Sequence, residues 1–399
     1  MRRLRSVKPL PALLVPLVLA TGIWLGGHPD YLPGFVRGPL VADSDGRLYE
    51  EALDVVADNY YRAVDRDKLV DTGLEATVDS LGDRFSHYFD PQAYKDFREA
   101  TEGAFEGVGM NVEEVPRGLR VVSVFDGSPA QRGGVKAGDL ITSVDGRSIA
   151  GRSTEEATTR IKGRAGTQVT LTVVSPGEEP RTVRLRRARV DVPVVEAEMR
   201  RSGGTKVAHV RLSSFTSGAH GEVRAAVDRL LERGAEGVVL DLRHNGGGLL
   251  NEAVLVSSIF IPEGTIVSTR GRSRPRRVFE ATGTSIDSKI PVVVLVDRAS
   301  ASASEIVTGA LQDRDRARVV GTRTFGKGVF QEIRRLSNGG ALDITVGEYF
   351  TPDGRNLGGG GVRQGAGIRP DVTAVDDVKT RNRDEALDVA VRTVLAGAT

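Results

Sequence analysis

The stretch from Pro291 to Gln331 constrains the fold of this chain more than any other part of its sequence. It opens with a continuous apolar run, Val292 to Val296, which is typical of a strand buried on both faces of a parallel sheet. Small residues follow in the order Ala-Ser-Ala-Ser-Ala-Ser, and a helix-like pattern begins at Glu305. Small side chains at a strand-to-helix turn let a substrate backbone approach, and the free amides of the helix's first turn can stabilise a developing negative charge. The stretch therefore predicts an α/β fold with a site at this turn.

Serine and lysine in this stretch suggest nucleophilic catalysis without histidine. Ser300, Ser302 and Ser304 precede the helix, Lys327 lies between two glycines further along, and no histidine stands between them. A serine hydroxyl needs a base to take its proton, and an unprotonated lysine amine can do this. Lowering the lysine pKa from about 10.4 to ~7–8 requires burial, at a cost of roughly 3–4 kcal/mol. Gln331, four residues after Lys327, would face the same side of a strand and could orient the amine.

A phosphate-binding loop is the alternative for the same lysine. The residues from Gly321 to Lys327 fit G-x-x-x-x-G-K. The next residue should be Ser or Thr and is Gly328, and the segment from Val329 to Ile333 alternates like a strand where a helix should begin. Both departures disfavour nucleotide binding.

The motif DRASASASEIVTGALQDRDRARVVGTRTFGKGVFQ resembles the active-site block of the C-terminal processing peptidases, or tail-specific proteases. The resemblance implies a crotonase-like α/β protease core with an inserted β-rich PDZ domain and an N-terminal helical region. It also implies that Ser302 is the nucleophile, Lys327 the general base and Gln331 its orienting partner. Ser300 and Ser304 are then small polar residues at a helix start, where Ser304 could serve as the N-cap.

Composition excludes several other kinds of site. The chain has 399 residues, no cysteine and five scattered histidines, so neither disulfides nor a metal site is expected, and the resemblance implies no cofactor. The formal net charge is only +2, and four basic side chains lie within residues 2–8. The remainder is nearly neutral, which argues against a nucleic-acid surface.

Residues 1–42 have the layout of an export signal. Basic residues 2–8 precede residues 9–27, which carry no charge and as a helix would span ~28 Å at ~1.5 Å per residue. The segment is either a cleaved signal peptide or an uncleaved membrane anchor. In both cases the positive-inside rule predicts that the rest of the chain is extracytoplasmic, either tethered or secreted.

Residues 43–102 are predicted to be helical, with apolar residues such as Leu48, Ala52 and Val55 at helical spacing. Residues 103–190 show short strands and turns, and Ser153-Thr-Glu-Glu is a capping box for a helix that runs to about Ile161. The order of motifs here resembles a PDZ domain, which binds a peptide's terminal carboxylate and adds the peptide to a sheet edge. The resemblance places the carboxylate-binding loop at Gly107, Val108, Gly109 and Met110, and the groove side of the helix at Ala157 and Ile161.

Residues 191–379 alternate strands and helices, which predicts the α/β core, and residues 380–399 suggest a terminal helix. The strand that ends at Asp241 leads into the glycine-rich turn after Arg243. The matching DLRxNxGG segment of the family implies that the amide of Gly247 or Gly248 forms the oxyanion hole with that of Ala303. Asp241 and Arg243 are interpreted as a structural pair.

The function predicted from these features is a serine endopeptidase that captures protein C-termini through its PDZ domain and cleaves with a Ser/Lys dyad. The alternative is a catalytically silent PDZ scaffold that only binds tails. Protein tails are the expected partners, with membrane contact only through the N-terminal segment. A homo-oligomer or an activating partner is compatible with the sequence.

Overall fold

A computed structural model describes residues 44–376 and 383–397, so the predicted signal or anchor in residues 1–42 lies outside the described residues. Its chain divides into two compact units, with the boundary between Gly82 and Asp83. In the first unit, Asp65 caps the second of two helices by accepting hydrogen bonds from the backbone nitrogens of Asp67 and Lys68. The two helices are α3 (Ser44–Asn59) and α4 (Arg66–Asp79). No helix within the described ranges is both long and apolar enough to cross a membrane.

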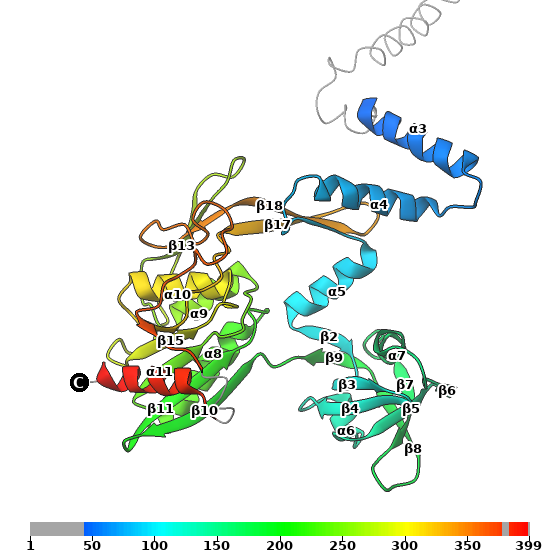
Figure 1. The fold of residues 1–399 in the computed structure, drawn as a ribbon. Helices are drawn as coiled ribbons and strands as arrows, with labels where there is room; N and C mark the ends of the chain where they lie inside the picture. The colour runs from blue at the N-terminus through cyan, green and yellow to red at the C-terminus, as the bar shows by residue number, and fades with distance from the viewer. Residues whose placement is uncertain (1–43, 377–382, 398–399) are drawn as a thin grey trace, which may run out of the picture. The chain divides into compact units, whose positions relative to one another are not determined.

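The second unit is built around a six-stranded sheet in the order β10-β11-β12-β15-β16-β19. The first pair is antiparallel and the other neighbouring strands are parallel. Helices α8, α9 and α10 cover one face, and α11 packs on the other (Figure 1). The strands are β10 (Val195–Ser202), β11 (Thr205–Leu212), β12 (Gly237–Asp241), β15 (Val292–Val296), β16 (Arg318–Gly321) and β19 (Val372–Thr373). The helices are α8 (Ala219–Glu232), α9 (Leu250–Ser258), α10 (Ala303–Asp313) and α11 (Glu385–Ala396).

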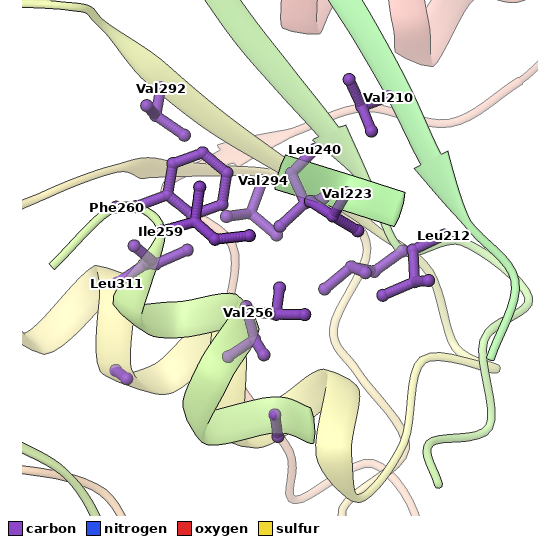
Figure 2. Packing of buried hydrophobic residues seen from close by; sticks show 14 of the residues in the cluster. Val210, Leu212, Val223, Leu240, Val256, Ile259, Phe260, Val292, Val294 and Leu311 are labelled. Carbon is purple, nitrogen blue, oxygen red and sulfur yellow. The ribbon is translucent and has the colours of Figure 1, made fainter. Parts of the chain in front are cut away.

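Strand β15 is buried on both faces, as the apolar run predicted. Val292, Val294 and Val296 belong to the cluster under α8, α9 and α10, part of which Figure 2 shows. Val293 and Leu295 face the opposite way, into the cluster under α11. Each fully buried aliphatic side chain of this kind stabilises the fold by roughly 1.5–3 kcal/mol. The strand that leads to the serine turn is therefore held from both sides.

A second sheet has the order β1-β18-β13-β14, and β17 pairs with β18. Its strands are β1 (His87–Phe89), β13 (Thr265–Arg270), β14 (Arg277–Glu280), β17 (Val329–Arg335) and β18 (Ala341–Phe350). The sequence predicts a helical region over residues 43–102, and β1 corrects that prediction at residues 87–89. Its three residues show no period of their own, and they become a strand because β18 supplies their backbone hydrogen bonds.

After β1, helix α5 (Pro91–Glu102) leads into a β-rich segment that has its own hydrophobic core. The pairing of β2 with β9, for example Ala104 with Asp191, places the entry and the exit of this segment side by side. A domain that is inserted into another domain of the same chain has its two ends close together in this way. Its elements are β2 (Ala104–Gly107), β3 (Met110–Val115), β4 (Gly118–Val124), α6 (Pro129–Arg132), β5 (Leu140–Val144), β6 (Arg147–Ser148), α7 (Thr154–Ile161), β7 (Gln168–Val174), β8 (Arg181–Arg186) and β9 (Ala188–Asp191).

Candidate active site

The three serines in the turn between β15 and α10 differ in the hydrogen bonds that their hydroxyl groups make. The hydroxyl of Ser300 donates to the carbonyl of Leu242 at 2.8 Å, and that of Ser304 donates to the carbonyl of Asn245 at 2.8 Å. Both side chains are fully buried and tie the turn to the loop after β12. Among the described residues, the Ser302 hydroxyl has no such backbone acceptor. It, and not Ser304, occupies the N-cap position of α10, which corrects the N-cap considered from the sequence.

Ser302 is held in an uncommon backbone conformation, with φ of 55° and ψ of −113°. A positive φ at a residue with a Cβ costs of order 1–3 kcal/mol and persists only where the surroundings impose it. Its backbone N–H donates to Oε2 of Glu305 at 2.9 Å. Gly247 closes the other side, because a Cβ added there would lie 2.9 Å from the Ser302 Cβ. The fold thus fixes Ser302 at the point where the sheet, the glycine loop and α10 meet.

Glu305 joins the serine turn to the lysine loop. Its side chain is fully buried, and Oε2 accepts the backbone N–H groups of both Ser302 and Lys327, each at 2.9 Å. Oε1 accepts the Thr324 hydroxyl at 2.6 Å and the Gly326 N–H at 2.7 Å. Burial raises the pKa of this carboxyl, while the four donors favour its ionised form. One carboxylate oxygen therefore holds the backbones of both predicted dyad residues.

Lys327 is half-buried, and Nζ donates a hydrogen bond to Oε1 of Gln331 at 2.9 Å. Its Nζ also lies 4.6 Å from the centre of the Phe85 ring. Burial lowers the pKa of the Lys327 ammonium below its usual value of 10.5, although the carboxylates of Asp343 and Asp83 act in the opposite direction. The structure thus brings Lys327 and Gln331 together and lowers the lysine's proton affinity, as a base near neutral pH requires.

No hydrogen bond joins Ser302 to Lys327 in the part of the chain that the structure describes. The Ser302 side chain instead lies close to the hydroxyl of Tyr349, which is on β18 and is buried. Burial raises the pKa of Tyr349, and the nearby Ser302 side chain acts in the opposite direction. The tyrosine is therefore protonated at neutral pH and can donate to the serine oxygen.

The backbone N–H groups of the predicted oxyanion donors differ in whether they already donate a hydrogen bond. The Gly247 N–H already donates to Oδ1 of Asn245 at 2.9 Å. The N–H groups of Gly248 and Ala303 make no hydrogen bond within the described residues, and Ala303 is the first residue of α10. A Cβ added to Gly247 would lie 3.0 Å from the Ala303 nitrogen, so the glycine loop and the helix start are in contact. Close approach of these backbones requires glycine at 247, where φ is 109°.

The phosphate-loop alternative is wrong for this chain. The segment after Lys327 is strand β17, whereas a phosphate-binding loop leads directly into a helix. Lys327 already donates to Gln331, and the Gly326 N–H, which a phosphate would need, is bound to Glu305.

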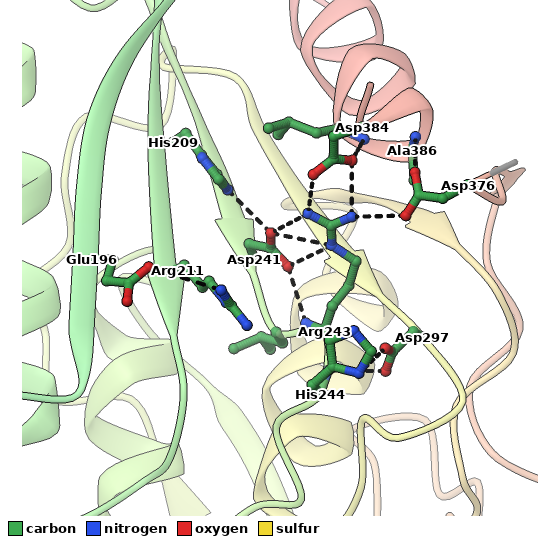
Figure 3. A network of polar contacts seen from close by, with 12 residues as sticks. Glu196, His209, Arg211, Asp241, Arg243, His244, Asp297, Asp376, Asp384 and Ala386 are labelled. Carbon is green, nitrogen blue, oxygen red and sulfur yellow. Dashed lines mark hydrogen bonds and ion pairs between the residues drawn. The ribbon is translucent and has the colours of Figure 1, made fainter. Parts of the chain in front are cut away.

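Asp241 and Arg243 form part of a polar network at the carboxyl end of β12 (Figure 3). Asp241 is fully buried and lies 3.1 Å from Nε2 of His209. Arg243 donates to Asp241 at 2.7 Å and to Asp384 at 2.7 Å, next to the start of α11. Burial alone would raise the pKa of Asp241, but the bonds from His209 and Arg243 lower it to about 2. The network anchors α11 to the strand that carries the glycine loop, which fits the predicted structural role.

The residues assigned to peptide binding divide into two groups. Gly107, Val108, Gly109 and Met110 connect β2 to β3. The carbonyls of Val108 and Gly109 accept the backbone N–H groups of Ala130 and Phe125, which fixes the loop. Ala157 and Ile161 are 0% and 5% exposed and belong to the core of this segment. Both side chains, one helical turn apart, point into the interior. Their contact with a peptide stays a prediction.

Three residues around the site were not singled out from the sequence. Glu305 could have been found, because Ser302 followed three residues later by Glu is a capping-box signature. Tyr349 and Phe85 carry no comparable signal, since strand pairing and not local sequence brings them to the site. No group of three or more His, Cys, Asp or Glu that could hold a metal ion occurs among residues 44–376 and 383–397.

Comparison with known proteins identifies the family. The model of Peptidase family S41 matches residues 206–374, and a PDZ domain model matches residues 120–175. The carboxy-terminal-processing protease of Bartonella bacilliformis is 38% identical over 330 residues, which cover 81% of this chain and 74% of that protein. This chain belongs to peptidase family S41.

Another curated protein and a solved structure are also similar to this chain. A probable CtpA-like serine protease of Staphylococcus aureus (strain COL) is 35% identical over 326 residues, or 81% of this chain. The match covers only 64% of the staphylococcal protein's length. Among solved structures, the photosystem II D1 C-terminal processing protease is 31% identical, with 84% of this chain and 94% of that chain covered and a TM-score of 0.48. The fold class predicted from the sequence, an α/β protease core with a PDZ domain and an N-terminal helical region, is confirmed by the family matches and by the observed elements.

Proposed function

We propose that this S41 member is a serine endopeptidase that hydrolyses peptide bonds with Ser302 as nucleophile and Lys327 as general base. The observation that carries the proposal is the shared Glu305 oxygen, which holds the backbones of both residues. Ser302 is also the one serine of the turn whose hydroxyl is not bound to a backbone carbonyl. The lowered pKa of Lys327 supports its role as a base.

In the proposed reaction, neutral Lys327 takes the proton of Ser302 as the serine oxygen attacks the substrate carbonyl. Gln331 accepts one amine hydrogen and so leaves the amine lone pair free to face the serine. The attack requires the Ser302 side chain to rotate from Tyr349 towards Lys327. The protonated lysine then gives its proton to the leaving amine, and a water molecule activated in the same way hydrolyses the acyl-enzyme.

The amides of Gly248 and Ala303 are the proposed oxyanion donors. Both lack a protein acceptor among the described residues. Ala303 follows Ser302 in the chain, and Gly248 follows Gly247, which contacts Ser302. Loss of one such donor typically lowers kcat by about 10²–10³-fold.

Protein C-termini are the proposed substrates, captured by the PDZ domain before cleavage. The basic residues 2–8 and the uncharged residues 9–27 support an extracytoplasmic location, either anchored or secreted. An oligomer or an activating partner could bring Ser302 and Lys327 into contact, since they are not hydrogen-bonded in the described structure.

The full chain in mild detergent tests the proposal with an unstructured protein that ends in apolar residues. Wild type should cleave it, while Ser302→Ala and Lys327→Ala should bind the tail without cleavage. Blocking the substrate's C-terminus by amidation should weaken binding. Binding without cleavage by all three proteins would instead support the silent scaffold, and cleavage by Ser302→Ala would refute the proposed nucleophile.

A further inference from the structure

A segment from far upstream in the chain packs beside Lys327. Strand β1 pairs with β18, and His87 lies opposite Asp343. Just before β1, the buried Ser86 hydroxyl accepts the backbone N–H of Thr345 at 3.0 Å. Phe85 contributes the ring under the lysine. The immediate surroundings of the proposed base are therefore built partly by residues 83–86.

A chain of polar contacts runs from this segment to the lysine. The Asp83 carboxylate accepts the Ser86 hydroxyl at 2.7 Å and lies close to the side chain of Thr345, which lowers the pKa of this carboxyl. Nε2 of Gln331 donates to the Thr345 hydroxyl oxygen at 2.9 Å. Oε1 of Gln331 then accepts from Nζ of Lys327 at 2.9 Å.

The Asp83 carboxylate determines which groups donate and which accept along these contacts. An ionised carboxylate only accepts hydrogen bonds, so the single hydroxyl hydrogen of Thr345 points to Asp83. The threonine oxygen then offers only lone pairs to Gln331, which must turn its NH₂ group towards Thr345 and its carbonyl towards Lys327. A reversed amide would place NH₂ against the lysine's own hydrogens. The side chains of Thr345 and Ser86 lower the pKa of Asp83, against the effect of burial, so the carboxylate form is present at neutral pH.

We propose that Asp83 and Thr345 are positioning residues for Lys327, because together they fix which end of the Gln331 amide faces the lysine. This inference rests on the proposed function, in which Lys327 is the base. Neither residue touches the reacting atoms. Each acts through the amide that orients the amine.

The two residues differ in charge, and this allows their effects to be separated. Thr345→Val removes the hydroxyl but no charge, so it should lower kcat about 3- to 10-fold with KM unchanged, and Thr345→Ser should restore kcat. Asp83→Asn also removes a carboxylate that favours the protonated lysine, so the acidic limb of the kcat/KM profile should move to lower pH. The other charged groups that face Lys327 or its neighbour Asp343 remain in this variant, namely Asp343, Glu305, Arg84 and His87.

The experiment compares these variants of the full chain by steady-state hydrolysis of one peptide between pH 5 and pH 10, with the folded fraction measured by circular dichroism. Thr172→Val is the matched control, because its hydroxyl accepts a strand-to-strand hydrogen bond from Ser143 at 2.6 Å in the PDZ segment. The control should keep wild-type kcat per folded molecule and the wild-type pH profile.

Wild-type kcat in folded Thr345→Val, or an equal loss in Thr345→Ser, would overturn the inference. If Thr345→Val does not fold, an unshifted profile and unchanged kcat in Asp83→Asn would overturn it. Lys327→Ala separates this result from the proposed function. Full activity in Lys327→Ala would refute both proposals, whereas an inactive Lys327→Ala beside a fully active Thr345→Val would refute only the positioning role.

Discussion

Glu305→Gln is the perturbation that most directly tests how the two loops of the site are joined. The substitution keeps the shape of the side chain and replaces one carboxylate oxygen by an NH₂ group, so the donors on that side lose their acceptor. If the NH₂ group faced Ser302 and Lys327, two buried backbone N–H groups would be orphaned. If it faced Thr324 and Gly326, the threonine hydroxyl could turn to accept, and only the Gly326 N–H would be orphaned.

The second orientation costs less and sets the expected magnitude. One orphaned buried donor destabilises by about 1–3 kcal/mol, and the remaining bonds weaken because they lose their charge assistance. We therefore expect the free energy of unfolding to fall by about 2–4 kcal/mol. The link between the Ser302 and Lys327 backbones should survive in weakened form, with kcat reduced about 10-fold.

Urea denaturation followed by circular dichroism measures the stability, and peptide hydrolysis per folded molecule measures kcat. Asp139→Asn is the control, since this buried carboxylate accepts the backbone N–H of Lys136 at 3.0 Å in the PDZ segment. The control should lose comparable stability and keep kcat. A Glu305→Gln protein as stable and active as wild type, or an equal loss of kcat in the control, would refute the reasoning.

Further predictions concern the polar network, the glycine loop and the lysine. Arg243→Ala leaves the buried Asp241 carboxylate without its main partner and should reduce stability by about 3–5 kcal/mol in urea denaturation. Because the folded pKa of Asp241 is about 2 against 3.8 in the unfolded chain, its contribution is present above about pH 4 and is lost as the pH falls towards 2. This contribution to the free energy of unfolding is about 2 kcal/mol. The unfolding free energy of Asp241→Asn should therefore lack this loss when the pH is lowered. Gly247→Ala places a Cβ 2.9 Å from the Ala301 carbonyl at a φ of 109°, so kcat should fall at least ~10-fold with tail binding kept. Activity should rise with pH through the pKa of Lys327, and this limb should lie below 10.5 because burial favours the neutral amine; a limb at or above 10.5 would contradict the buried base.

The core of the site could be predicted from sequence because its parts lie in one contiguous stretch. The apolar run of β15, the alternating small residues and the strand-like segment after Lys327 each have a local signature, and the structure forms β15, α10 and β17 there. The contact of Lys327 with Gln331 follows from their spacing on and beside one strand.

The remaining wall of the site could not be predicted because pairing over long sequence distances creates it. Strand β1 is only three residues long and has no period, so nothing local places Phe85 under Lys327. The same holds for the partner of Arg243, Asp384, which arrives with the terminal helix. The burial of Ala157 in the domain core depends on how deeply α7 packs against the sheet, which helical spacing alone does not determine.

The most direct test of the central claim is to identify the residue that reacts with a fluorophosphonate, a reagent that modifies activated serines. Tandem mass spectrometry of the labelled full chain locates the adduct among Ser300, Ser302 and Ser304. We expect a single adduct on Ser302 in wild type, none in Ser302→Ala, and labelling slowed at least ~100-fold in Lys327→Ala. An adduct on Ser300 or Ser304, or labelling of Lys327→Ala at the wild-type rate, would contradict it.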